Sequence, residues 1–92
     1  MMSKRICRVV SQTEAVSVPT KSGDTIQKCY LRLKEIGSDY ADEFNSAVLG
    51  NLAQTRYQKG EVVAVALRFR VNEREGNLYQ DITATDIVRM KG

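Results

Sequence analysis

Hydrophobic and polar residues alternate along much of the chain, and a period of two is typical of β-strands with one buried face. The alternation is clearest in residues 61–72, which we predict to form a strand. Its inward face is expected to carry Val63, Val65, Leu67, Phe69 and Val71. Its outward face is expected to carry Ala64, Ala66, Arg68 and Arg70. We expect Phe44, like Phe69, to lie in the core.

Residues 25–36 alternate in the same way. One face carries Cys29, Leu31 and Leu33, and the opposite face carries Lys28, Tyr30, Arg32 and Lys34. In residues 78–90 we predict that Ile82 and Ala84 face inward, and that the outward side chains are Tyr79, Asp81, Thr83 and Thr85. Ile87 is expected to rejoin the core after a register shift at Asp86. Residues 73–77 are predicted to form a hairpin loop before this last strand.

The first predicted strand, residues 6–18, is long and rich in β-branched side chains. Its alternation slips near Gln12 and Thr13, which predicts a bend or bulge that lets one strand serve both halves of a barrel. A turn follows, because the next residues include the turn formers Pro19, Ser22, Gly23 and Asp24. Residues 37–42 are predicted to form a polar loop.

Residues 43–57 have two interpretations, since helical spacing also relates Phe44, Val48 and Leu52. We predict a strand as far as Leu49. A short helix is then expected from Asn51, which could cap it, to Tyr57. Gly60 is expected in a left-handed conformation after the helix.

Five strands with one short helix between the third and fourth form an all-β chain with the element order of the OB-fold, a partly open five-stranded barrel. A length of 92 residues, 42% of them hydrophobic, fits one such domain over residues 1–92. No apolar run approaches the ~20 residues needed to cross a bilayer. The N-terminus lacks the apolar segment of a signal peptide. We therefore expect a cytoplasmic protein with no membrane partner.

The net charge of +3 arises from 14 basic and 11 acidic side chains. A balance this mild says little about nucleic acid by itself, but the charges are unevenly distributed. Residues 1–34 carry seven basic and two acidic groups, and residues 35–61 carry two basic and five acidic groups. Residues 62–92 carry five basic and four acidic groups. The first two predicted strands are therefore the positive end of the molecule.

Residue types suited to catalysis are scarce in this chain. It has two cysteines and no histidine, which excludes the usual Cys/His zinc sites. The acidic cluster of Asp39, Asp42 and Glu43 has no further convergent ligands. We expect no metal, no cofactor, no small-molecule substrate and no enzyme activity. Cys7 and Cys29 are expected to be buried, reduced thiols, with a disulfide between the first two strands as the alternative.

Four motifs within residues 44–90 resemble the bacterial single-stranded DNA-binding protein family. Residues 49–53 (Leu-Gly-Asn-Leu-Ala) are similar to the start of the family's helix, and residues 57–60 (Tyr-Gln-Lys-Gly) to its turn. Residues 67–70 (Leu-Arg-Phe-Arg) resemble its Leu-Arg-Thr-Arg strand, and residues 81–87 its closing strand. In length and loop size the chain is more similar to small, tail-less OB-fold proteins of Bacteroidetes. The resemblance implies binding of single-stranded DNA in replication or repair.

The chain departs from the family pattern at the positions that stack bases. It has no tryptophan, and Asn72 follows the two arginines. The outward face of the third predicted strand carries Glu43, Asn45, Ala47 and Leu49. The family's acidic tail is also missing before the chain ends at Gly92. We therefore expect weaker affinity per site than in the family and a greater need for oligomerisation.

Binding of single-stranded nucleic acid requires cations for the phosphates and flat side chains that stack on bases. We predict a salt-dependent, sequence-tolerant interface formed by Lys28, Tyr30, Arg32, Lys34, Arg68, Arg70 and Tyr79. Lys21 and Arg74, in the two hairpin loops, could extend the phosphate path. The expected partners are single-stranded DNA, or RNA, and further copies of this chain.

Two alternatives remain for the same residues. Every antiparallel strand of a barrel has an outer face, so these charges can be a solvated surface. The fold can also serve as a protein-interaction or assembly module without nucleic-acid binding, with Tyr30 and Tyr79 in an interface. The acidic stretch from Glu35 to Glu43 and the open edges of the barrel favour that second alternative.

Overall fold

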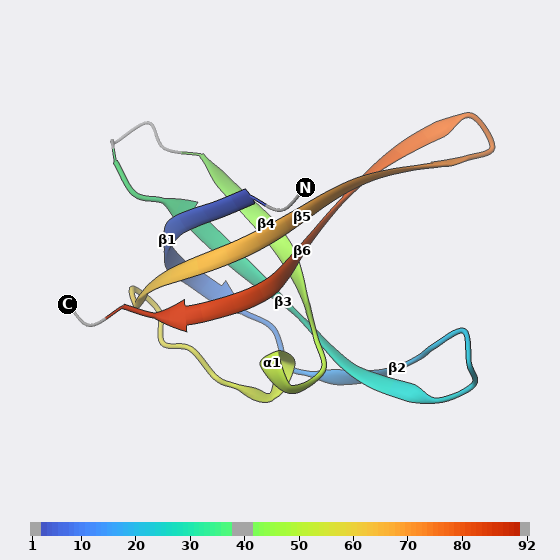
Figure 1. Cartoon of the computed structure of the whole chain (residues 1–92), viewed down its shortest axis with the longest axis horizontal. Helices are drawn as coiled ribbons and strands as arrows, with labels where there is room; N and C mark the ends of the chain where they lie inside the picture. Colours follow the sequence, from blue (N-terminus) through green and yellow to red (C-terminus); the bar gives the residue numbers. More distant parts are fainter. Residues whose placement is uncertain (1–2, 38–41, 91–92) are drawn as a thin grey trace.

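A computed structural model describes residues 3–37 and 42–90 (Figure 1). The chain forms six strands and one short helix in the order β1 (Ser3–Gln12), β2 (Val16–Pro19), β3 (Thr25–Glu35), β4 (Glu43–Leu49), α1 (Asn51–Gln54), β5 (Val62–Arg74) and β6 (Asn77–Arg89). Within the described residues, no helix is long and apolar enough to span a membrane.

The strands form one sheet whose ends meet. The order across the sheet is β1-β5-β6-β4-β3-β2, and an additional β1–β3 pairing closes the ring. All pairings are antiparallel except a short parallel pairing of β4 with β6. This ring, with α1 between β4 and β5, confirms the predicted OB-fold. The first of the five predicted strands corresponds to β1 and β2 together.

The predicted bend in the first strand is confirmed. β1 pairs with β5 through Ser3–Arg8 and with β3 through Cys7–Gln12, with a register shift between Val9 and Ser11. The strand breaks after Gln12 and continues as β2, which pairs only with β3. One bent segment therefore contacts both halves of the sheet, as closure of a small barrel requires.

The core lies inside this ring. Its buried side chains come from every long strand and from α1, and they are Cys7, Val9, Cys29, Leu31, Leu33, Val48, Ala53, Val63, Val65, Leu67, Ala84 and Ile87. Phe44 and Ile82 pack against them and are partly buried. Ser46 is the buried polar residue of β4, and its hydroxyl donates a hydrogen bond to the carbonyl of Leu31 at 3.0 Å. The predicted inward faces of β3 and β6 are confirmed.

The prediction for the inward face of β5 is wrong at its far end. Phe69 is 40% exposed and Val71 is 62% exposed. The reason is that β5 and β6 extend beyond the barrel as a projecting hairpin, where no other strand covers their faces (Figure 1). Phe69 instead lies under the Arg5 guanidinium, 5.3 Å from the ring centroid. Ala66, predicted outward, is only 8% exposed, because Lys4 and Asp86 flank its small side chain on the neighbouring strands.

The predicted register shift in the last strand is confirmed, one residue earlier than expected. Ala66 pairs with Asp86 and Leu67 with Ala84, so Thr85 is the extra residue of a β-bulge. The Thr85 hydroxyl donates to the carbonyl of Ala66 at 3.2 Å. The bulge lets both Ala84 and Ile87 face the core although they are three residues apart.

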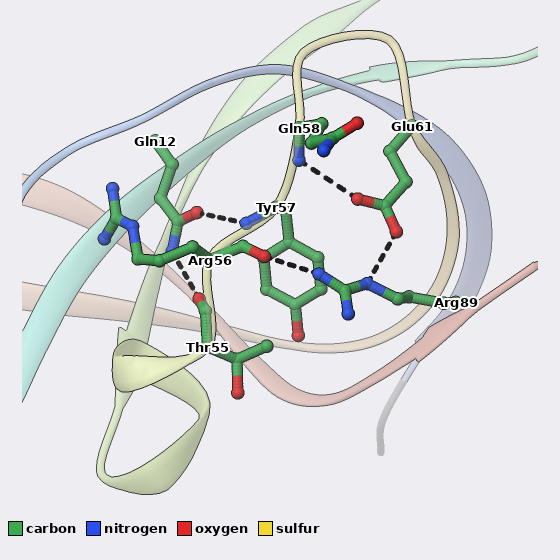
Figure 2. Close-up of polar contacts among 7 residues, drawn as sticks. All are labelled: Gln12, Thr55, Arg56, Tyr57, Gln58, Glu61 and Arg89. Atoms are coloured by element: carbon green, nitrogen blue, oxygen red, sulfur yellow. Dashed lines mark hydrogen bonds and ion pairs between the residues drawn. The ribbon is translucent and has the colours of Figure 1, made fainter.

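The helix is shorter than predicted. It ends at Gln54, and the side chain of Asn51 makes no capping hydrogen bond, because Gly50 holds the cap position. Residues 55–58 are held away from a helical path by Gln12 of β1 (Figure 2). The Gln12 amide donates to the carbonyl of Thr55 and accepts from the backbone N–H of Tyr57, each at 2.9 Å.

The turns are compact. Glu75 (φ 52°) and Gly76 (φ 81°) form a two-residue hairpin turn, so the strands extend into the loop predicted for residues 73–77. Two positive φ values at a two-residue turn are typical of type I′. Gly60 has φ 89°, as predicted for a left-handed position. Residues 38–41 of the predicted 37–42 loop lie outside the described part of the chain.

The two cysteines are free and buried, so the alternative of a disulfide is not realised. The pKa of the Cys7 thiol is raised from 9.0 to about 11, chiefly because the thiol is buried. The Glu35 carboxylate contributes to the rise, and the Arg5 guanidinium opposes it. Cys7 is therefore a protonated, apolar core side chain near neutral pH.

Candidate nucleic-acid interface

The outward faces of four strands form one continuous surface. In the sheet, Tyr30 of β3 pairs with Ala47 of β4, and Ala47 pairs with Thr83 of β6. Thr83 in turn pairs with Arg68 of β5. These four residues form one row across the sheet. Side chains two residues away on each strand occupy the neighbouring rows on the same face.

A groove of about 390 Å³ lies on this face above β4. Its walls are Lys28 and Tyr30 of β3 on one side and residues 80–83 of β6 on the other, and its floor is Asn45, Ala47 and Leu49. A second hollow of about 440 Å³ follows the projecting hairpin, lined by Asn72, Arg74, Tyr79 and Asp81. Asp81 lines both, so the two are adjacent, and we call them together the β3–β6 groove.

The shape of the molecule frames this groove. Figure 1 shows the β2–β3 and β5–β6 hairpins projecting from the same side of the barrel, on the right of the view. One wall of the groove belongs to β3 and the other follows the β5–β6 hairpin. A flexible polymer lying across the face would therefore contact several strands at once, as ligands of OB-folds do.

Two tyrosines lie in the groove, one in each of its two hollows. Tyr30 is 41% exposed and Tyr79 is 51% exposed. The ammonium of Lys28 lies 5.1 Å from the centroid of the Tyr30 ring, which is a cation–π contact. One face of the Tyr30 ring is therefore covered by Lys28, whereas Tyr79 has no cation over its ring among the described residues.

The predicted cations divide into two groups. Arg68 and Arg70 are exposed on the outward face of β5, opposite Thr83 and Asp81 of β6. Lys28 lines the groove itself. Arg32, in contrast, forms an ion pair with Glu43 at 2.6 Å. Lys34 lies near the far end of β3, paired in register with Arg8 and Glu43.

Of the seven predicted residues, Lys28, Tyr30 and Tyr79 line the groove, and Arg68 and Arg70 lie on the adjoining outward face of β5. Arg32 lies opposite Asn45 of the groove floor with its guanidinium paired with Glu43, and Lys34 lies opposite Glu43 in the register. The structure also adds polar residues that sequence reasoning did not select, namely Asn45, Asn72, Gln80 and Asp81. Alternation marks Asn45, Asn72 and Asp81 as outward and Gln80 as inward, and it does not show which strands are neighbours. The register between β4 and β6, which is parallel and non-local, carries that information.

A second polar surface lies beside the linker that follows α1, and Figure 2 shows its contacts. A hollow of about 530 Å³ is lined by Arg56, Tyr57, Gln58, Glu61 and Arg89. Arg89 pairs with Glu61 at 2.6 Å, donates to the carbonyl of Arg56 and lies 4.9 Å from the centroid of Tyr57. Burial raises the pKa of Tyr57. The guanidinium of Arg89 is already bound by Glu61 and by the carbonyl of Arg56. We therefore assign this surface the role of holding the linker in place.

Clusters of three or more metal-ligating side chains are absent from the part of the chain that the structure describes. Asp42 and Glu43, from the acidic cluster considered above, belong to that part, and Asp39 lies outside it.

Comparison with known proteins places the fold among solved structures. No protein-family model matches the chain, and no curated protein matches it. The second OB-fold domain of replication protein A from Methanococcus maripaludis is similar, with a TM-score of 0.73 and 20% identity over 100% of this chain and 86% of that domain.

Two further structures are similar over nearly their whole length. The small single-stranded DNA-binding protein from Streptomyces coelicolor has a TM-score of 0.54 and 19% identity over 98% of this chain and 94% of that protein. The PriB protein from Ralstonia solanacearum has a TM-score of 0.51 and 19% identity, with 97% of each chain covered. At these identities the likeness is one of fold. The chain is an OB-fold protein, mostly strand with one short helix.

Proposed function

We propose that this protein is a non-catalytic module that binds single-stranded nucleic acid in the β3–β6 groove. The observation that carries the proposal is the placement of two exposed tyrosines, Tyr30 and Tyr79, in one groove flanked by cations. A similar solved structure is a single-stranded DNA-binding protein. Lys28, Arg68, Arg70 and Arg74 would contact phosphates, and the tyrosines would stack bases at about 1–3 kcal/mol each.

The direct test is a fluorescence anisotropy titration of a labelled oligo-dT strand at low and at moderate salt. We expect the double variant Arg68→Ala/Arg70→Ala to bind at least about tenfold more weakly at low salt, since charge-assisted contacts contribute about 1.5–3 kcal/mol. The double variant Tyr30→Leu/Tyr79→Leu is expected to bind the strand more weakly by a similar factor.

A matched control lowers the net charge by the same two units elsewhere. Lys59 is exposed in the turn before β5 and does not line the groove. The variant Lys59→Glu should bind nearly as the wild type does. The proposal is wrong if the wild type does not bind at low salt, or if the arginine and control variants weaken binding equally. Replacing the oligo-dT with its RNA counterpart decides between the two polymers.

The proposal includes the absence of turnover and a cytoplasmic place of action. Incubation of a labelled strand with the protein and Mg²⁺ is expected to leave the strand's length unchanged. Cleavage above background, lost in a groove variant, would contradict the non-catalytic assignment. Participation in replication or repair is the process that such binding would serve.

Assembly of several copies is the second candidate function, and another part of the outer surface favours it. Ile6, Ala64 and Val88 form an apolar row on the outer side of β1, β5 and β6, with Ile6 and Val88 exposed. The next row is Lys4, Ala66 and Asp86. A two-fold axis would cover the apolar row and bring Lys4 of one copy to Asp86 of the other.

Light scattering tests this candidate. We expect a homo-oligomer that Val88→Lys dissociates, whereas Leu78→Lys on the projecting hairpin leaves its mass unchanged. A wild type that is monomeric at all concentrations tested would contradict self-association. A stable oligomer that ignores oligonucleotides would favour assembly as the main function.

A further inference from the structure

The β3–β6 groove is not uniformly basic, and its acidic member lies at its centre. Asp81 lines both of the hollows that make up the groove. A carboxylate at this point repels phosphates, which a site built only for the backbone of a polyanion would avoid. A carboxylate in the centre of a binding groove favours a ligand group that donates hydrogen bonds.

The contacts of Asp81 leave part of its carboxylate available. Asn72 donates a hydrogen bond from its amide to Oδ2 of Asp81, and Arg70 lies opposite in the β5–β6 register. Among the described residues, no hydrogen bond reaches Oδ1. Asp81 is exposed, so this oxygen can accept from a ligand in the groove.

Tyr79 places a stacked base next to that oxygen. Tyr79 and Asp81 are two residues apart on the outward face of β6, and both line the hairpin part of the groove. Two residues of a strand span roughly 7 Å, which is about the width of a nucleobase. A base stacked on the Tyr79 ring therefore presents its edge to Asp81.

The four bases differ in what they offer to an ionised carboxylate, which only accepts hydrogen bonds. Guanine presents two adjacent donors, N1–H and the N2 amino group. Cytosine and adenine each present one amino donor beside an acceptor. Thymine and uracil present one N–H between two carbonyl oxygens, which a carboxylate repels. The order of preference at this position should therefore begin with guanine and end with thymine or uracil.

We propose that Asp81 accepts hydrogen bonds from the Watson–Crick edge of a guanine stacked on Tyr79, so that the protein binds guanine-containing single strands in preference to strands of thymine alone. This proposal rests on the proposed function and adds one base preference to otherwise sequence-tolerant binding. Asn72 holds the carboxylate in place, and Arg70 balances its charge in the absence of ligand.

The test compares two labelled strands of roughly 12 nucleotides, within the range that one OB-fold occupies. One strand is homothymidine, and the other carries isolated guanosines in the same background. We expect the wild type to bind the guanosine strand about fivefold or more tightly, the low end for paired hydrogen bonds to a base edge. Inosine, which lacks the N2 amino group, should reduce the preference, and 7-deazaguanine, which keeps the Watson–Crick edge, should retain it.

The variant Asp81→Asn separates base recognition from simple repulsion, because the two predict different signs. Recognition predicts weaker binding of the guanosine strand and tighter binding of homothymidine, so the preference disappears. Repulsion alone predicts tighter binding of both strands by the same factor. Glu73→Gln is the matched control, since Glu73 is exposed on the opposite face of the same hairpin, paired in register with Leu78.

Each outcome is decisive. Equal binding of the two strands by the wild type, or an equal gain for both strands in Asp81→Asn, overturns the guanine proposal and leaves the proposed function standing. Failure of the wild type to bind either strand at low salt overturns the proposed function as well. Loss of the preference in Asp81→Asn, with the preference unchanged in Glu73→Gln, supports the proposal.

Discussion

At the scale of single residues, the Gln12 side chain makes hydrogen bonds to the linker backbone that a neighbouring strand would otherwise make. Residues 55–58, directly after α1, belong to no strand, and the Gln12 amide satisfies two of their backbone groups, the carbonyl of Thr55 and the N–H of Tyr57. The same amide lies 3.6 Å from the sulfur of Cys29 in the core. One side chain thus connects β1, β3 and the linker.

We predict that Gln12→Ala destabilises the protein by about 1–3 kcal/mol, because the linker loses two hydrogen bonds in a partly buried place. Gln12→Glu should also destabilise it, since a carboxylate keeps the acceptor for Tyr57 and loses the donor for Thr55. Urea unfolding at neutral pH measures both. Gln54→Ala, an exposed change at the end of α1, serves as the control and should have little effect.

The Cys7 thiol gives the stability a pH dependence in the alkaline range. Its pKa is about 11 in the folded protein and 9.0 as the ordinary value, so the folded state holds the proton more tightly. The stabilisation is complete below pH 9 and is lost as the pH rises through 11, because the unfolded chain ionises first. The free energy of unfolding should fall by on the order of 2–3 kcal/mol over this range, since each unit of pKa difference contributes about 1.4 kcal/mol.

The check is unfolding in denaturant between pH 8 and 11 for the wild type and for Cys7→Ala. The variant starts from a lower stability because it leaves a cavity, and it should fall less steeply with pH. Parallel curves for the two proteins would show that other groups cause the alkaline loss.

At the scale of elements, the β5–β6 hairpin has one basic and polar face and one apolar face. Arg68, Arg70 and Tyr79 belong to the first, and Phe69 and Val71 to the second. Its two-residue turn holds the arm together, and both of its residues have positive φ. The arm carries Tyr79 and Arg74, so its order is coupled to the proposed binding.

We predict that Gly76→Ala loosens this arm, because a side chain in the left-handed region costs about 1–2 kcal/mol. Amides of the hairpin should exchange faster with solvent while those of the core strands remain protected, and oligonucleotide affinity should fall. Glu75→Asn should act in the opposite direction, since Asn-Gly is preferred in type I′ turns. Uniform loss of protection across the whole barrel would contradict this local role.

At the scale of the whole molecule, the mild net charge conceals a local concentration of cations. Lys28, Arg68, Arg70 and Arg74 flank the groove, whereas Arg32 is paired with Glu43. Counterions released from a single strand make the logarithm of affinity fall with the logarithm of salt concentration, with a slope of about −0.7 for each phosphate contact. Four contacts predict a slope of roughly −3 for the logarithm of affinity against the logarithm of salt concentration.

Salt titrations of oligonucleotide binding test this count. Arg68→Ala should reduce the magnitude of the slope by about 0.7, and Lys59→Ala should leave it unchanged. A wild-type slope near zero would contradict binding through phosphates, whatever the affinity.

The sequence by itself determined the strands, their inward faces and the order of elements. Alternation is a local property, so it identified Leu31, Leu33 and Ala84 as core residues, and the turn formers and the bend near Gln12 gave the OB-fold order. The register shift that returns Ile87 to the core was also readable, because a period of two cannot bury Ala84 and Ile87 together.

Only the tertiary structure decided where the barrel ends and which outward faces meet. Phe69 and Val71 continue the inward pattern of β5 yet lie beyond the strands that would cover them. Alternation along one strand does not show where the neighbouring strands end. The helix stops at Gln54 because Gln12, distant in sequence, binds the segment that follows. The groove exists because β4 pairs with β6 in parallel, which brings Tyr30 and Asp81 to one surface although 50 residues separate the chain segments that carry them. Such contacts depend on non-local register, and a one-dimensional pattern does not contain it.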